Sequence, residues 1–300
     1  MSDHDYDSGC AWVDGDYVPL NDARIPLMDM GFLHCDATYD VVAVWNRKYF
    51  RLTEHLERFE TSWQRLRMTP PVSLPEMRTI LDGCVSRAGL ANAYVSMIMS
   101  RGVALPGVRD PRKIENRFYA YATTYSWIVK PEDQEVGSHL VISEKTIRIP
   151  NQAVDPTVKN FHWGDMVRGL FEAYERGGQT IVLADADGHV MEGPGFNVFA
   201  YDGKTLRTPA VGMLEGITRR TVLELADEMG IPTAVEQFGT DVLRDAEEIF
   251  ITSTAGGVMP ATTLDGEPVG TGKPGPVTLR LRQAYWEAHD EERWITPVEY

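Results

Sequence analysis

Short apolar runs alternate with amphipathic helical patterns along most of the chain. The strands that this pattern predicts lie at 39–45, 94–100, 118–125, 139–147 and 247–253. The helices lie at 53–68, 75–89, 163–176 and 218–229, and a last one starts near Pro276. Strands that alternate with helices indicate an α+β protein rather than an all-helical bundle.

Two helices in the first half show this periodicity clearly. The helix at 53–68, with Thr53 as its expected cap, has one apolar face made of Leu56, Phe59, Trp63 and Leu66. The next helix begins near Pro75 and stops at Gly89, and its apolar stripe contains Met77, Ile80, Leu81 and Cys84. Spacings of three and four residues place such side chains on one side of a helix, where they face a core.

Length and composition narrow the class of protein. A chain of 300 residues predicts about two domains. We expect them at 1–129 and 138–300, joined by a polar linker at 130–137 that contains Pro and Gly. A net charge of −15 argues against nucleic acid or an anionic membrane as a partner.

Targeting signals and cysteine usage indicate a compartment. The acidic first residues do not resemble a signal peptide, and no apolar run is long enough to span a bilayer. The three cysteines, Cys10, Cys35 and Cys84, are an odd and widely spaced set. A reducing, cytoplasmic location is therefore expected.

Several familiar motifs are excluded by their context. The segment 270–275 matches GxGxxG, but a polar turn precedes it and Pro274 removes a backbone donor, so we interpret it as a loop. The chain has no GxSxG motif and no P-loop. Its seven histidines are scattered without the spacing of metal ligands, so no metal is expected.

Three glycine-containing turns in the second half are better candidates. They are EGPGFN (192–197), LEGITRR (214–220) and TSTAGG (252–257). Each alone is typical of an ordinary turn or cap. Together, backbone N–H groups at a helix start and Thr hydroxyls favour a bound phosphate ester.

Lys159 is the candidate nucleophile. It lies in DPTVKNFHWGD, beside Val158 and Phe161. A lysine in this context is either a surface residue with its stem packed on apolar neighbours or a desolvated amine that can form a Schiff base.

These residues together resemble the fold-type IV pyridoxal phosphate (PLP) aminotransferases. The chain is most similar to the (R)-selective amine transaminases of that family, from about Gly15 to Tyr300. The segments that carry the resemblance are 31–41, 50–59, 155–169, 192–198, 216–222, 252–266 and 274–278. The resemblance implies an α+β, two-domain fold with a small N-terminal domain and a larger C-terminal PLP-binding domain.

The resemblance also implies roles for individual residues. Lys159 would hold PLP covalently, Glu192 would bind the pyridine nitrogen, and Leu214 would pack on the ring. The phosphate would be bound by Arg58, Ile217, Thr218, Ser253 and Thr254. A carboxylate beside the ring nitrogen keeps it protonated, which makes the ring a better electron sink.

By the same resemblance, the substrate pocket lies in the N-terminal domain and its long loop. Its expected lining is His34, Tyr39, Val41, Tyr94, Ser96, Arg109, Trp163 and Ala255. Arg109 would bind the carboxylate of a keto acid; alternatively, it is a solvated loop charge. Some fungal relatives have Phe and Glu in place of Tyr94 and Ser96, which leaves the substrate preference of the pocket open.

The expected reaction is ping-pong amino transfer from an (R)-amine to a keto acid such as pyruvate, or the reverse onto a ketone. The alternatives are a D-amino-acid or branched-chain aminotransferase, a C–O lyase of the aminodeoxychorismate lyase type, and a non-catalytic PLP-binding protein. A homodimer with the active site at the subunit interface is expected, as in the family.

Overall fold

The computed structural model describes residues 6–300. Most of the acidic start, on which the expectation of no signal peptide depends, lies outside the described residues. None of the helices described is both long and apolar enough to cross a membrane. The chain forms two units: unit 1 contains residues up to Ser126 together with Val158–Phe161 and His289–Tyr300, and unit 2 contains Trp127–Thr157 and His162–Ala288.

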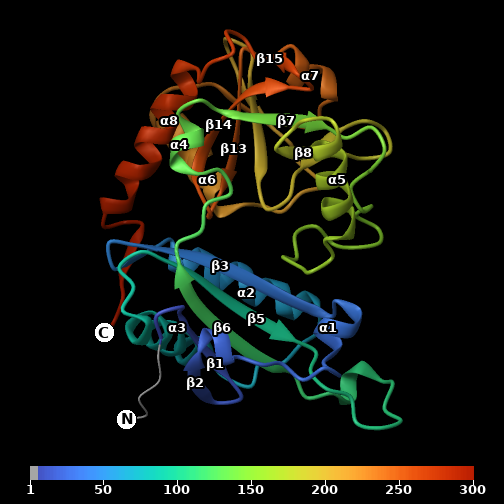
Figure 1. The fold of residues 1–300 in the computed structure, drawn as a ribbon, viewed down its shortest axis with the longest axis vertical. Coiled ribbons are helices and arrows are strands. Elements are labelled where there is room, and N and C mark those ends of the chain that lie inside the picture. Colours follow the sequence, from blue (N-terminus) through green and yellow to red (C-terminus); the bar gives the residue numbers. More distant parts are fainter. Residues whose placement is uncertain (1–5) are drawn as a thin grey trace. The chain divides into compact units, whose positions relative to one another are not determined.

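Unit 1 is built on an antiparallel seven-stranded sheet, with the strand order β16-β4-β3-β5-β6-β1-β2 (Figure 1). Its strands are β1 (Cys10–Val13), β2 (Asp16–Pro19), β3 (Ala37–Trp45), β4 (Lys48–Phe50), β5 (Ala93–Ser100), β6 (Arg117–Thr124) and β16 (Ile295–Pro297). Its helices are η1 (Leu20–Asp22), α1 (Met30–His34), α2 (Leu52–Arg65), α3 (Leu74–Ala88) and η2 (Pro111–Lys113), and η3 (Ala288–Asp290) begins at the boundary.

The core of unit 1 lies between one face of this sheet and helices α2 and α3. Both predicted apolar faces are confirmed, since their members are buried in the core or packed against it. The predicted end of α3 is also confirmed: Gly89 has a φ of 65°, a left-handed conformation that glycine adopts without strain.

The predicted cap of α2 at Thr53 is wrong. The helix begins at Leu52, and Arg51 precedes it in a left-handed conformation. The Arg51 N–H donates to the carbonyl of Trp294, 2.6 Å away, and its guanidinium lies over the Trp294 ring. The start of the helix therefore follows from this contact with a distant segment of the chain rather than from a local capping residue.

Unit 2 contains a mixed nine-stranded sheet with the order β12-β11-β10-β13-β14-β7-β8-β9, and β15 pairs with β14 (Figure 1). Its strands are β7 (Ser138–Ile142), β8 (Thr180–Ala184), β9 (Val190–Glu192), β10 (Asn197–Tyr201), β11 (Leu206–Thr208), β12 (Thr233–Val235), β13 (Glu248–Ser253), β14 (Gly257–Leu264) and β15 (Glu267–Pro268). Its helices are α4 (Pro131–Gln134), α5 (Gly164–Glu175), α6 (Ile217–Glu228), α7 (Thr240–Arg244) and α8 (Pro276–Glu287).

Two segments of unit 2 differ from the sequence-based expectation. The strand predicted at 139–147 ends at Ile142, because the carboxylate of Glu172 accepts hydrogen bonds from the N–H groups of Glu144 and Lys145 and holds them in a turn. The segment 130–137, expected as a linker, includes helix α4 and belongs to unit 2.

The GxGxxG-like segment is a loop, as predicted, and it ends at the start of α8. The anion position at this helix start is taken by the chain itself. The Glu248 carboxylate accepts hydrogen bonds from the N–H groups of Val277 and Thr278 and from the Thr278 hydroxyl, at 2.7–3.1 Å. A carboxylate there is stabilised by the helix dipole in the way that a phosphate would be.

Candidate active site

Lys159 belongs to unit 1, where its short segment lies along the edge of β3. The Lys159 carbonyl accepts hydrogen bonds from the Tyr39 N–H at 3.0 Å and from the Thr38 hydroxyl at 2.6 Å. The Lys159 ammonium lies 4.6 Å from the centroid of the Tyr39 ring, and that ring packs on Phe161. The backbone of the candidate nucleophile is therefore fixed to the sheet, and its amine lies against an aromatic face.

Arg58 is oriented by a buried acid on the neighbouring strand. Its guanidinium donates two hydrogen bonds to the Asp40 carboxylate, at 2.7 and 2.8 Å, and the Nδ1 atom of His55 lies 2.7 Å from the same carboxylate. Burial alone would raise the pKa of Asp40, but Arg58 and His55 hold it well below its usual value. Burial lowers the pKa of His55, although its contact with Asp40 opposes this shift.

The sheet face opposite the unit 1 core carries the predicted pocket residues Tyr39, Val41, Tyr94 and Ser96. Val41 lies directly opposite Ser96 in the β3–β5 register, and alternation along each strand puts Tyr39 and Tyr94 on the same face. Tyr121 lies opposite Ser96 on β6 and joins them, a residue that the sequence reasoning missed. Burial raises the pKa of Tyr94 and of Tyr121, so these side chains form an uncharged aromatic surface.

The other two pocket candidates in unit 1 lie on exposed segments. His34 is at the carboxyl end of α1, and Arg109 is in the loop between β5 and η2. Both side chains are exposed to solvent within unit 1. Their part in a pocket remains a prediction.

In unit 2, Glu192 ends strand β9 and is held at both carboxylate oxygens. Its Oε1 accepts a hydrogen bond from Arg148 Nε at 3.1 Å, and its Oε2 accepts one from the Leu214 N–H at 3.0 Å. The Glu192 side chain is only 5% exposed. A buried carboxylate that a guanidinium and a backbone N–H hold in place is suited to a cationic N–H group.

Asn197 brings the two phosphate-binding candidates together within unit 2. It pairs with Thr252 across strands β10 and β13, and its side-chain amide donates to the Leu214 carbonyl at 2.8 Å. A Cβ atom at Gly216 would come within 2.1 Å of the Asn197 amide oxygen, so only glycine fits this close approach. The start of α6 therefore lies beside the end of β13.

The start of α6 and the end of β13 both present hydrogen-bond donors. Helix α6 begins with Ile217 and Thr218, and the residue at its N-cap position, Gly216, has no side chain that could cap the helix. The buried Thr252 hydroxyl likewise has no hydrogen-bond partner among the described residues. A helix N-terminus beside an unsatisfied hydroxyl fits a phosphate ester.

The remaining unit 2 candidates lie near these elements in the sequence. Ser253 is the last residue of β13, Thr254 follows it in the turn, and the Ser253 hydroxyl accepts the Ala255 N–H at 3.2 Å. Trp163 precedes α5 and packs on the apolar cluster beneath that helix.

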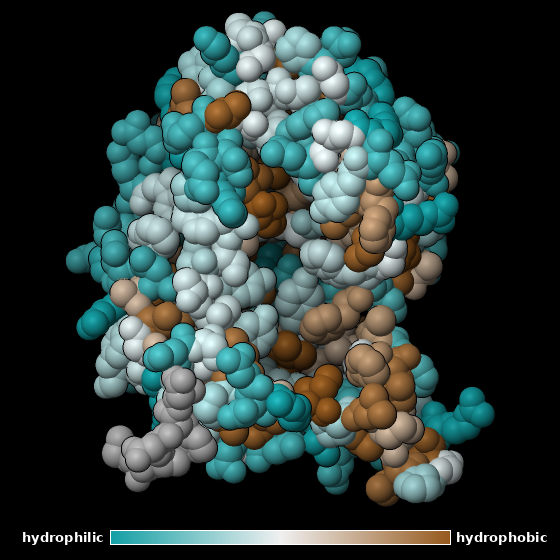
Figure 2. All heavy atoms as spheres, in the orientation of Figure 1, coloured by the Kyte–Doolittle hydropathy of each residue, from teal (hydrophilic) through white to brown (hydrophobic). Residues whose placement is uncertain are grey.

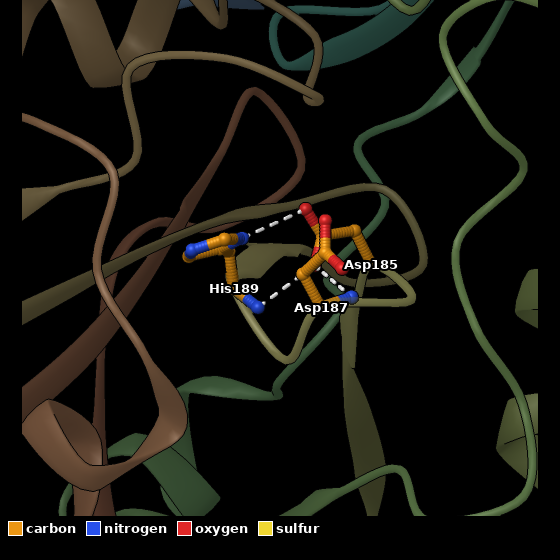
Figure 3. Close-up of side chains that lie close together, drawn as sticks. All are labelled: Asp185, Asp187 and His189. Carbon is orange, nitrogen blue, oxygen red and sulfur yellow. Dashed lines mark hydrogen bonds and ion pairs between the residues drawn. The ribbon is translucent and has the colours of Figure 1, made fainter.

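Asp185, Asp187 and His189 lie close together in the turn between β8 and β9 (Figure 3). The Asp185 carboxylate accepts the N–H groups of Asp187 and His189 and lies 3.1 Å from His189 Nδ1. Burial opposes the shift, but these hydrogen bonds hold the pKa of Asp185 below its usual value. They are the hydrogen bonds of a tight turn, and we assign the cluster a structural role.

The structure adds residues that the sequence reasoning missed. Asp40 orients Arg58, Arg148 and its partner Asp165 lie behind Glu192, and Asn197 holds the α6 turn. In the sequence, the one feature that marks these residues is a charged or amide side chain in an otherwise apolar segment, as in TIRIP around Arg148. Such a signal marks burial and does not identify the partner.

The model of one protein family, amino-transferase class IV, matches residues 37–264, more than half of the chain. The chain belongs to the class IV aminotransferases. It is thus an aminotransferase, and PLP is its cofactor, as predicted; the α+β fold of type IV is confirmed by solved structures. One is the branched-chain amino acid aminotransferase from Thermobaculum terrenum in its PLP-bound holo form, which is 25% identical, with a TM-score of 0.87 over 99% of this chain and 100% of that one.

Two kinds of name occur among the curated relatives that this class IV aminotransferase matches. A putative branched-chain-amino-acid aminotransferase of Methanocaldococcus jannaschii is 29% identical over 91% of this chain and 94% of its own length. A D-alanine aminotransferase of Listeria monocytogenes serotype 4b is 29% identical over 92% and 94%. These names agree better with the alternative of an amino-acid aminotransferase than with the expected (R)-amine subgroup.

Proposed function

We propose that this class IV aminotransferase binds PLP through Lys159, Glu192 and the donors around α6. The observation that carries the proposal is the buried Glu192 carboxylate, whose two oxygens are held by the Arg148 guanidinium and the Leu214 N–H. The phosphate is assigned to the α6 start at Ile217 and Thr218 and to the hydroxyls of the last residue of β13 and of the turn that follows. The full proposed phosphate set is Arg58, Ile217, Thr218, Ser253 and Thr254.

When bound, PLP supplies an aldehyde that condenses with amines and a ring that withdraws electrons. Lys159 Nζ would hold that aldehyde covalently between turnovers, and after its release the amine would carry a proton to and from the substrate carbon. Glu192 keeps the ring nitrogen protonated. The hydrogen bonds from Tyr39 and Thr38 to the Lys159 carbonyl fix the backbone position from which the amine acts.

For the substrate, we propose first an amino acid with a small or branched aliphatic side chain, paired with a keto acid. The relatives named above support this choice, and Arg109 is the proposed carboxylate partner. The second candidate is an (R)-amine. It is supported by the uncharged face made of Tyr39, Val41, Tyr94, Ser96 and Tyr121, which suits an apolar substituent.

We propose further that the protein is a homodimer. Unit 1 exposes a set of apolar side chains around α1 and in the loop after β5: Ile25, Leu27, Met28, Phe32, Leu33 and Leu105. Figure 2 shows a hydrophobic area over α1. An exposed apolar patch of this kind marks an interaction surface.

Lys159→Ala tests the proposed reaction. We expect the variant to lose covalent PLP, seen as coenzyme that borohydride no longer fixes to the chain, and to lose at least about a thousandfold in amino-transfer rate. The control is Lys145→Ala, an exposed lysine in unit 2. Normal turnover with borohydride-fixed coenzyme in the Lys159 variant would overturn the proposal.

A substrate panel separates the alternatives. Wild-type protein is given pyruvate or 2-oxoglutarate with D-alanine, L-leucine or either enantiomer of 1-phenylethylamine, and product formation is measured. Turnover of D-alanine or L-leucine well above both amines supports the first candidate, whereas preference for the (R)-amine supports the second. Pyruvate released from an aminodeoxychorismate-type substrate without an amino acceptor would indicate a lyase.

A further inference from the structure

Arg148 is buried, which is unusual for an arginine side chain. Its side chain is 7% exposed, and it lies between two buried carboxylates, those of Glu192 and Asp165. Burial alone lowers the pKa of Arg148, but the two carboxylates outweigh this effect and raise the pKa above its usual value. The guanidinium is therefore permanently charged at this buried position.

The arginine is anchored on the side away from Glu192. Its backbone N–H donates a hydrogen bond to the Ala184 carbonyl of β8 at 2.9 Å, and its side-chain Nη1 atom donates one to Asp165 Oδ2 at 2.6 Å. Asp165 is itself held by the backbone, since its two oxygens accept the N–H groups of Ile149 and Met166 at 2.8 and 2.9 Å. Asp165 lies in the first turn of α5, where the helix dipole also favours a negative charge.

These contacts fix the direction of the Arg148 guanidinium independently of Glu192. Its Nε atom points at Glu192 Oε1, while the Leu214 N–H holds Oε2 from the other side. An anchored donor at each oxygen fixes the plane of the carboxylate as well as its position.

We propose that Arg148, fixed by Asp165, is a positioning residue that keeps the Glu192 carboxylate ionised and aimed at the ring nitrogen of PLP. The inference rests on the proposed role of Glu192. Without the guanidinium, two buried carboxylates would lose the cation they share, and one would take up a proton. A protonated Glu192 no longer holds the ring nitrogen in its cationic form.

The test compares Arg148→Met and Arg148→Lys with Arg176→Met as a matched control. Arg176 also belongs to unit 2 and also pairs with more than one carboxylate, those of Glu172 and Asp265. Each holoenzyme is prepared with PLP that carries ¹⁵N in the ring, and the ¹⁵N chemical shift reports whether the ring nitrogen is protonated. The PLP dissociation constant, kcat and KM are measured on the same proteins.

The wild type and the Arg176 variant are expected to give the shift of a protonated ring nitrogen. In Arg148→Met this signal moves to the unprotonated position, PLP binds roughly tenfold more weakly and kcat falls roughly 10- to 100-fold, with a smaller change in KM. Arg148→Lys, which keeps the charge and loses the planar fork, is expected to recover part of the shift and of kcat. A merely structural role for Arg148 would lower stability and leave the ¹⁵N signal in place.

The inference is overturned if folded Arg148→Met keeps the wild-type ¹⁵N shift and PLP affinity. If that variant does not fold, Asp165→Asn replaces it, because it loosens the anchored arginine, and an unchanged signal there overturns the inference equally. Failure of the proposed function gives a different result. In that case the wild type either does not bind PLP or keeps a protonated ring nitrogen after Glu192→Gln.

Discussion

At the residue scale, buried charges in this protein occur in small sets whose members orient one another. In unit 1 the Asp40 carboxylate accepts hydrogen bonds from both Arg58 and His55. In unit 2 Arg148 donates hydrogen bonds to both Glu192 and Asp165. Charged groups are retained at such positions only when their partners are precisely placed, because desolvation is costly. The candidate site residues Arg58 and Glu192 are therefore each oriented by a neighbouring charged side chain.

The pair Asp40–Arg58 predicts a specific dependence of stability on pH. We expect Asp40→Asn to lower the free energy of unfolding at pH 7 by about 3–5 kcal/mol, since it leaves a largely buried guanidinium without its acid. The folded-state pKa of Asp40 lies below its unfolded value, so its contribution is fully present above about pH 4 and is lost as the pH falls further. Urea unfolding of both proteins between pH 7 and pH 3 should show the difference shrinking only at the acid end.

Asp110→Asn is the control for that experiment. Asp110 also pairs with an arginine, Arg112, and hydrogen bonds from Arg112 lower its pKa to about 2, but this pair lies at the surface. We expect no measurable loss of stability from this change. A difference between wild type and Asp40→Asn that is the same at pH 3 and at pH 7 would contradict the account given for Asp40.

At the element scale, helix positions are well predicted where the signals are local. The Pro75 and Gly89 signals of α3 and the Pro276 start of α8 all agree with the structure to within one residue. The start of α2 does not, because Arg51 is held by Trp294, a residue far away in the sequence. The segment LEGIT predicts the start of α6, whereas the close contact of Gly216 with Asn197 appears only in the fold.

Helix α8 provides a test of how a helix start is stabilised by its own chain. Glu248→Gln replaces a buried carboxylate that accepts three hydrogen bonds at this helix start. We expect a loss of about 2 kcal/mol in the free energy of unfolding, because the amide has one accepting oxygen and a weaker interaction with the helix dipole. The measurement is chemical denaturation at pH 7.

Glu135→Gln is the matched control for α8. Glu135 forms an ion pair with Arg282 of the same helix, but its side chain is exposed. We expect little or no change in the denaturation midpoint. Equal losses from the two glutamates would show that Glu248 does not act through the helix start.

At the scale of the whole molecule, the exposed apolar side chains of unit 1 predict association. Phe32 is 61% exposed and Leu105 is 70% exposed. Their segments run side by side, since the Met30 N–H donates to the Gly102 carbonyl and Asp29 pairs with Val103. A single apolar surface therefore draws on two separate parts of the sequence.

The double variant Phe32→Ser/Leu105→Ser tests the proposed dimer. We expect the wild-type protein to have twice the mass of the chain in light scattering, and the variant to dissociate at least about tenfold more readily. Val136→Ser, which removes an exposed apolar side chain in unit 2, should leave the mass unchanged. A wild-type protein with the mass of a single chain would refute the dimer.

The sequence by itself determined the elements, the α+β class and, through its resemblance to a family, the cofactor chemistry. Periodicity and turn residues act over a few neighbouring positions, so they can be read without the fold. Only the tertiary structure decided which residues support the site. Asp40 contacts Arg58, Arg148 links Asp165 to Glu192, and Asn197 holds the turn that contains Gly216. These pairs join segments distant along the chain, and a buried charge is stable only where folding supplies its partner.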